Sequence, residues 1–170
     1  MKSHYLLHFV FKKHIFKKSD NINLKHYSVY STYVDEDERA AGDSTLPVRD
    51  NILHIYVNLN TDLQAVAVRI TLDKTITLCS VYIPPNASLS LTQLKYLVDQ
   101  LPTPFIIMGD FNGHNPLWGS KTTTDKGKNL KNLSPRKNYV SLTTVLIHIY
   151  ILGMDLIQLL ILLLLIYLFF

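Results

Sequence analysis

Short runs of β-branched and apolar residues, separated by polar turns, dominate the middle of the chain. Three such runs follow one another at Ile52–Leu59, Ala65–Leu72 and Thr75–Ile83. Asn and Asp residues separate them, and Pro84-Pro85 stops the third, because proline cannot donate a hydrogen bond to a neighbouring strand. The pattern predicts three consecutive antiparallel strands.

One segment has helical periodicity instead. Leucine or valine recurs at positions 91, 94, 97, 98 and 101, a spacing that places these side chains on one helix face. Ser90 with Gln93 fits a capping box, and Pro102 ends the segment. Phe105–Met108 is then a short apolar run that predicts a buried strand. The order strand, helix, strand indicates an α/β fold, in which chemistry gathers at the carboxyl ends of strands.

The apolar residues are unevenly distributed. They make up 48% of the 170 residues, but all the basic residues lie at or before Lys137, and Asp155 is the one charged residue after it. We therefore predict a globular domain over residues 1–137 and an apolar tail over 138–170, in which a helix is expected. The apolar content of the front part is too high for intrinsic disorder.

Charge and cysteine content narrow the function classes only slightly. The 17 Lys and Arg outnumber the 13 Asp and Glu, which gives a net charge of +4. Basic clusters near residues 12–18 and 121–137 suit phosphate contacts, although an ordinary solvated surface is the favoured explanation of these clusters. The single cysteine, Cys79, excludes a disulfide framework and a cysteine-rich zinc site. Its apolar surroundings predict a buried, inert thiol with no disulfide partner.

The most informative segment is PFIIMGDFNGHNPLWG, over Pro104–Gly119. Asp110 and Asn112 flank Phe111, so on an extended backbone their side chains point to the same side. A carboxylate and an amide at a strand end can orient a water and a phosphate oxygen near a metal. His114 adds a candidate phosphate or metal contact. The alternative is an ordinary polar turn without chemistry.

The surrounding blocks favour chemistry. VYIPP (Val81–Pro85) precedes the predicted helix, and DKGKNL (Asp125–Leu130) follows GDFNGHNPLWG. With these blocks in this order, the sequence resembles the endonuclease/exonuclease/phosphatase superfamily, which has the DNase I-like fold. More closely, residues 11–133 resemble the endonuclease domain of insect jockey-type non-LTR retrotransposons. The resemblance implies a two-sheet α/β sandwich that hydrolyses DNA phosphodiesters with Mg²⁺ or Mn²⁺, nicking DNA for target-primed reverse transcription.

The resemblance also assigns roles to residues. It implies that Asp110 is a metal ligand that orients or deprotonates the attacking water, and that Asn112 holds the scissile phosphate. Tyr82 would contact that phosphate or stabilise the leaving group. His114 and Trp118 occupy substrate-side positions of the motif, with packing the favoured role for Trp118. The implied partner is DNA and the implied location is nuclear or cytoplasmic.

This copy departs from the family pattern. The family's first strand and its Asn have no counterpart, and Lys13 aligns with a metal-binding Glu, where an ammonium would repel a cation. The family's last catalytic block does not occur in the reading frame that gives this amino-acid sequence, so the sandwich is expected to be incomplete at both ends. Codon degeneracy nevertheless allows a shifted frame of residues 140–162 to spell the family's NDGS and SAIDL blocks. We therefore expect an impaired or inactive endonuclease, whose tail is a frameshift product.

Two alternatives remain open. The first is a small tail-anchored membrane protein, in which residues 145–170 enter the membrane and the front part is a residual binding module. Leu156–Phe170 is shorter than the roughly 20 apolar residues that a spanning helix needs, and the longer segment contains His148, Asp155 and Gln158. The second alternative is a decayed fragment without function.

Overall fold

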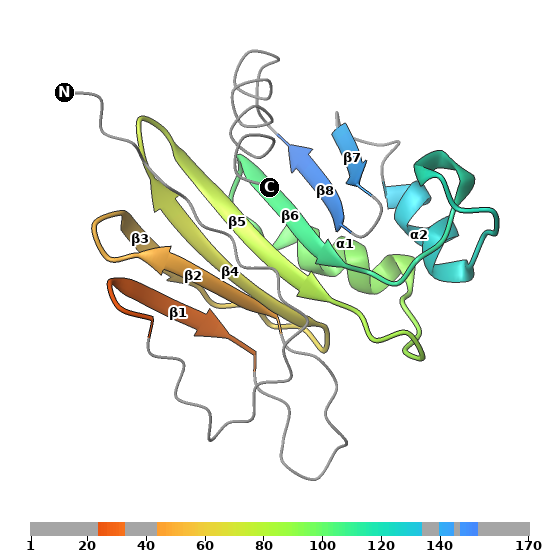
Figure 1. Ribbon diagram of the computed structural model, residues 1–170, viewed down its shortest axis with the longest axis horizontal. Coiled ribbons are helices and arrows are strands. Elements are labelled where there is room, and N and C mark those ends of the chain that lie inside the picture. The colour runs from red at the N-terminus through yellow and green to blue at the C-terminus, as the bar shows by residue number, and fades with distance from the viewer. Residues whose placement is uncertain (1–23, 33–43, 134–139, 145–146, 153–170) are drawn as a thin grey trace, which may run out of the picture.

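The computed structural model describes residues 24–32, 44–133, 140–144 and 147–152, which form two sheets with helices against the larger one (Figure 1). The elements in chain order are β1 (Tyr27–Ser31), β2 (Thr45–Arg49), β3 (Leu53–Val57), β4 (Gln64–Thr71), β5 (Thr75–Tyr82), α1 (Leu91–Asp99), β6 (Phe105–Asp110), the 3₁₀ helix η1 (Pro116–Trp118), α2 (Asp125–Leu133), β7 (Val140–Thr144) and β8 (Ile147–Leu152).

The larger sheet has the strand order β3-β4-β5-β6-β8-β7. Strands β3, β4 and β5 are antiparallel neighbours, which confirms the predicted succession of three strands. Strand β6 then pairs with β5 in parallel, because the chain crosses over through α1 between them. This crossover brings the carboxyl ends of β5 and β6 to the same edge of the sheet.

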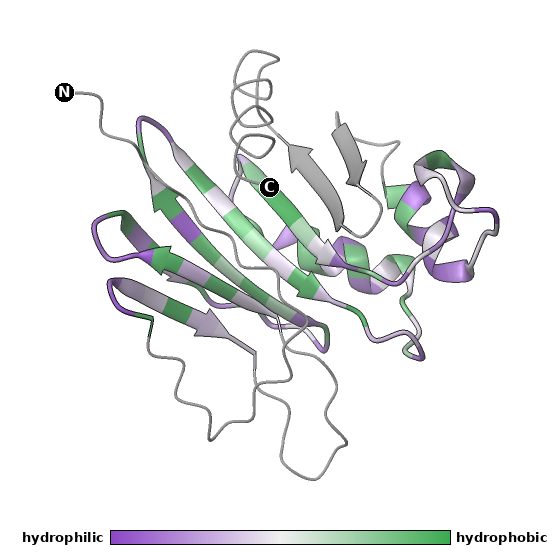
Figure 2. Cartoon of the chain, in the orientation of Figure 1, coloured by the Kyte–Doolittle hydropathy of each residue, from purple (hydrophilic) through white to green (hydrophobic). Residues whose placement is uncertain are grey.

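Both faces of the larger sheet are covered at β4, β5 and β6, and successive residues of one strand pack on opposite faces. Ala65 and Ala67 of β4 pack into a core with the leucines of α1 and α2. Val66 and Val68 instead pack into a second core with Leu46 and its neighbours in the small β1–β2 sheet. Strands buried on both faces need apolar residues on both sides, which explains why consecutive residues at 65–68 and 105–108 are apolar. Figure 2 shows hydrophobic bands in green along the strands, with paler and purple bands between them.

The predicted helix is confirmed, including its start. The Ser90 hydroxyl accepts a hydrogen bond from the Gln93 N–H at 3.1 Å, and the Gln93 side chain accepts one from the Ser90 N–H at 2.9 Å. Cys79 is buried and free, as expected, and burial raises the pKa of its thiol far above the ordinary value. The thiolate needed for reactivity is therefore suppressed.

The start of the tail differs from the expectation. Residues 140–144 and 147–152 are strands rather than helix, and β8 pairs antiparallel with β6. The physical reason is visible in the sequence, where Ile147, Ile149 and Ile151 alternate with other residues at the period of a strand. The rest of the tail, 153–170, lies outside the described residues. Of the helices in the described part, none is long and apolar enough to cross a membrane.

Candidate active site

The candidate site lies where β5 and β6 end. Tyr82 is the last residue of β5 and Asp110 the last of β6, and the two are partners in the parallel register. The Ile83 N–H donates to the Asp110 carbonyl at 2.9 Å, which continues the pairing beyond Tyr82. The two predicted catalytic side chains therefore start from adjacent backbone positions at one sheet edge.

Gly109 permits this close pairing. Its φ is +149°, and a Cβ at this position would lie 1.8 Å from the carbonyl oxygen of Val81. No side chain fits there, so only glycine lets β6 approach β5 immediately before Asp110. The glycine of the GDFN motif is a structural requirement for the position of its aspartate.

Asn112 reaches the site through a turn rather than by extended alternation. Its φ is +46°, so the chain has left the strand, and the expectation of an extended backbone is wrong here. The Asn112 N–H donates to Asp110 Oδ1 at 3.0 Å, and its Nδ2 donates to the Ile83 carbonyl at 2.9 Å. Asparagine tolerates this left-handed conformation better than most residues. The turn ties Asn112 to both strand ends.

Lys126 belongs to the same site, although no sequence motif singled out this lysine. Its Nζ donates to the carbonyls of Pro84 at 2.9 Å and Pro85 at 2.7 Å, which joins the first turn of α2 to the segment after β5. Burial lowers the pKa of the Lys126 ammonium, and the nearby Asp110 carboxylate opposes that shift. The only sequence signal was the DKG block itself.

Tyr82 is held in its neutral form. Partial burial raises the pKa of the phenol above its ordinary value of 10.0, and the negative charge of Asp110 raises it further. At neutral pH the Tyr82 hydroxyl is therefore a hydrogen-bond donor, able to contact an anionic oxygen such as that of a phosphate.

The other two predicted residues lie in the loop that follows. The backbone N–H of His114 donates to Thr124 Oγ1 at 3.0 Å, and its carbonyl accepts from the Thr124 N–H at 3.0 Å, while its ring is exposed. Gly127 allows this contact, since a Cβ there would lie 1.9 Å from the His114 carbonyl oxygen. The Trp118 indole donates to the Gly113 carbonyl at 2.9 Å and packs against the core. Trp118 therefore has packing contacts.

The site combines a carboxylate, an amide, a phenol and an ammonium. Among the described residues, no group of three or more His, Cys, Asp or Glu side chains lies together as a metal ion would require. Asp110 also has the Lys126 ammonium in its surroundings. The described residues therefore do not fit a complete metal site, and we derive no step through a metal. They can bind and orient a phosphodiester through the donors of Tyr82 and Lys126.

Comparison with known proteins agrees with this geometry. Residues 76–147 match the family model described as endonuclease-reverse transcriptase. Among solved structures, the endonuclease domain of TRAS1, a telomere-specific non-LTR retrotransposon, superposes with a TM-score of 0.63 at 19% sequence identity. The fold is DNase I-like. A search of the curated proteins finds no match.

The DNase I-like resemblance predicted from the sequence is thereby confirmed. The superposition covers 75% of this chain and 66% of the TRAS1 domain, so the chain spans slightly less than two thirds of that domain's length. The family match and the superposition show that the chain is similar to retrotransposon endonuclease domains, in sequence over residues 76–147 and in fold over most of its length. The family match runs past residue 137, where we placed the end of the globular domain, and that boundary stays a prediction.

Proposed function

We propose that this DNase I-like domain binds a DNA phosphodiester at the ends of β5 and β6 but does not hydrolyse it measurably. The single observation that carries the proposal is the pairing of Tyr82 with Asp110, to which Asn112 is hydrogen bonded. The ends of these two strands hold the Asp110 carboxylate, the Asn112 amide and the Tyr82 phenol in fixed positions. Together, these groups can recognise one phosphate and orient the water that attacks it.

The proposed roles follow the resemblance. Asp110 orients or deprotonates the attacking water, Asn112 holds the scissile phosphate, and Tyr82 contacts that phosphate or the leaving oxygen. His114 and Trp118 stay candidate substrate-side residues. Mg²⁺ or Mn²⁺ is the cation that the resemblance implies, with Asp110 as its ligand; hard carboxylate oxygens suit both ions. A nuclear or cytoplasmic location stays a prediction.

The proposed impairment rests on particular residues. Lys13 aligns with the metal-binding Glu of the family, and a lysine offers no oxygen to a cation. Within the described part, the cation near Asp110 is the Lys126 ammonium. A positive side chain there favours phosphate binding but disfavours a second cation beside the same carboxylate. Binding without efficient cleavage is the outcome that these charges favour.

Two measurements on the full chain test the proposal. Fluorescence anisotropy with a short DNA duplex in EDTA should show salt-dependent binding, and Asp110→Asn should bind at least as tightly, because it removes a negative charge beside the phosphate. Absence of DNA binding would overturn the proposed function. Plasmid nicking with Mg²⁺ or Mn²⁺ should be the same for the native chain and Asp110→Ala. Faster nicking by the native chain would show that the enzyme is intact and that the impairment is wrong.

A further inference from the structure

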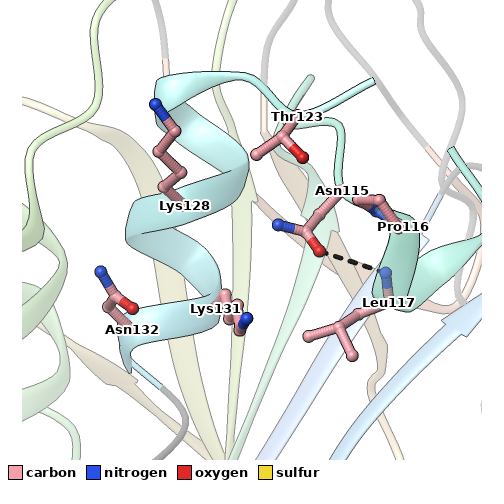
Figure 3. A pocket seen from close by; sticks show the side chains of 7 residues that line it. All are labelled: Asn115, Pro116, Leu117, Thr123, Lys128, Lys131 and Asn132. Atoms are coloured by element: carbon pink, nitrogen blue, oxygen red, sulfur yellow. Dashed lines mark hydrogen bonds between the residues drawn. The ribbon is translucent and has the colours of Figure 1, made fainter. Parts of the chain in front are cut away.

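A second polar site lies beside the candidate active site, in a pocket between η1 and α2. Its volume is about 570 Å³ (Figure 3). Seven residues line it. Two are apolar, Pro116 and Leu117, and five carry hydrogen-bond donors: Asn115, Thr123, Lys128, Lys131 and Asn132. No carboxylate is among the lining residues, so the pocket presents donors and positive charge.

Asn115 directs its side-chain amide toward this pocket. The residue is only 5% exposed, and its Oδ1 accepts the Leu117 N–H at 3.1 Å, as the N-cap of η1. That bond fixes the amide orientation, and Nδ2 is directed toward α2, into the space between the helices (Figure 3). An amide N–H in this direction can donate to an anionic oxygen in the pocket.

The two lysines of α2 make an anion the fitting ligand. Lys131 is exposed at the pocket, and Lys128 forms an exposed ion pair with Asp125 at 2.9 Å, three residues earlier. An exposed pair of this kind is weak and exchanges readily for a phosphate. Ammonium, amide and hydroxyl groups all donate to phosphate oxygens, and none of them reads base sequence.

The pocket is also rigidly connected to the candidate active site. Asn115 follows Asn112 by three residues along the same loop, and the His114–Thr124 hydrogen bonds fix that loop to the start of α2. A nucleic-acid strand with one phosphate at Asn112 would therefore pass close to the pocket. Leu117, which is 68% exposed, stands at the lip where a sugar or base would lie.

We propose that this pocket binds a second backbone phosphate of the nucleic-acid strand held at Asp110 and Asn112. The inference rests on the proposed function, because it adds one more phosphate contact to the same nucleic-acid substrate. By binding this phosphate, the pocket fixes the position of the nucleic-acid strand along the protein, and the adjacent phosphodiester then lies at Asp110 and Asn112. Asn115 and Lys131 are its principal donors.

Two variants of the full chain test the pocket. Asn115→Asp keeps the volume and the N-cap, since Asp and Asn cap equally well, but replaces the donor with a negative oxygen. We expect about a tenfold weaker duplex affinity by anisotropy. Lys131→Gln should weaken binding about threefold and reduce the salt slope by about one. The matched control is Lys95→Gln, the same charge change on the exposed face of α1, which should leave affinity unchanged.

A small probe separates this inference from the proposed function. Titration of the native chain with a thymidine dinucleotide, followed by backbone amide NMR, should shift Leu117 and Thr124, and Asn115→Asp should abolish those shifts. Such shifts support the pocket even if plasmid DNA is never cut. If duplex DNA binds with the same affinity to native chain, Asn115→Asp and Lys131→Gln, the pocket proposal is overturned and the proposed function stands. A further outcome is that inorganic phosphate alone causes the same NMR shifts while the two variants bind DNA as tightly as the native chain. That result would show that the pocket binds free anions and would also overturn the proposal.

Discussion

Tyr82 and Asp110 are direct partners at the ends of the parallel strands β5 and β6, and the charge of the aspartate acts on the phenol. The pairing is made by backbone, through a glycine that no other residue can replace, and the Asn112 turn closes over it. Each of these side chains is therefore held in place by a different element. The electrostatic interaction between Tyr82 and Asp110 can be measured by replacing one of the two residues at a time.

The first prediction concerns this coupling. Burial and the Asp110 charge together raise the pKa of Tyr82, so Asp110→Asn should lower it toward 10.0 without reaching it. The signal is the ζ-carbon shift of labelled tyrosine during a pH titration, assigned with Tyr82→Phe because the chain has ten tyrosines. An unchanged Tyr82 titration in Asp110→Asn would show that the two groups do not interact.

The sign of the stability effect follows from the same shift. A raised pKa means that the folded chain holds the phenolic proton more tightly than the unfolded chain does. The contribution of Tyr82 to stability is therefore intact below the unfolded value near 10.0 and is lost as the pH rises through the higher folded value. Urea unfolding of the native chain should weaken over that interval more steeply than unfolding of Tyr82→Phe.

The second prediction concerns the glycine beneath the site. Gly109→Ala would place a Cβ 1.8 Å from the Val81 carbonyl oxygen, at a φ of +149°. We expect a loss of roughly 3 kcal/mol or more in the free energy of unfolding, because backbone must move. The control is Gly119→Ala, where φ is +79° but no atom lies within 4 Å, so only the conformational cost of about 1–2 kcal/mol applies. Equal losses for the two variants would contradict the close pairing.

Local patterns predicted the strands and the helix whose stabilising contacts are periodic in sequence. The runs that became β3, β4, β5 and β6 and the capped helix α1 were all anticipated, together with the polar residues at the ends of β5 and β6. The helix α2 was not, because its sequence DKGKNLKNL is mostly polar and contains Gly127. Its position depends on the contact of that glycine with His114, which no local pattern encodes.

Lys126 was missed for a related reason. Its partners are backbone carbonyls 41 and 42 residues away, and backbone oxygens leave no trace in a sequence. Strands β1 and β2 also escaped prediction, since the residues of β1, YSVYS, are only half apolar and the pair becomes a layer by packing on the larger sheet. In the tail, composition suggested helix although the alternation of isoleucine indicated strand.

The third prediction concerns Lys126. Lys126→Gln removes a charged donor from two carbonyls in the segment that follows Tyr82. The bond to Pro84 is partly buried and the bond to Pro85 is exposed. We expect a destabilisation of about 1 kcal/mol, below the roughly 1.5–3 kcal/mol of charged hydrogen bonds, because solvent screens these two. Lys128→Gln is the matched control on the same helix, because its exposed pair with Asp125 contributes little. Urea unfolding compares the two, and equal destabilisation would refute a special role for Lys126.

The fourth prediction tests how the two sheets meet. Ser44, which precedes β2, and Ser80 of β5 are both buried, and their hydroxyls are 2.7 Å apart. Replacing either with alanine leaves the other hydroxyl without its partner, so each single variant should lose about 1–2 kcal/mol of unfolding free energy. The double variant leaves no orphaned hydroxyl, so its loss should fall short of the sum by at least 0.5 kcal/mol, a difference that a double-mutant cycle resolves. Strictly additive losses would mean that the two hydroxyls do not interact, and the small sheet would then not lie against β5 as described.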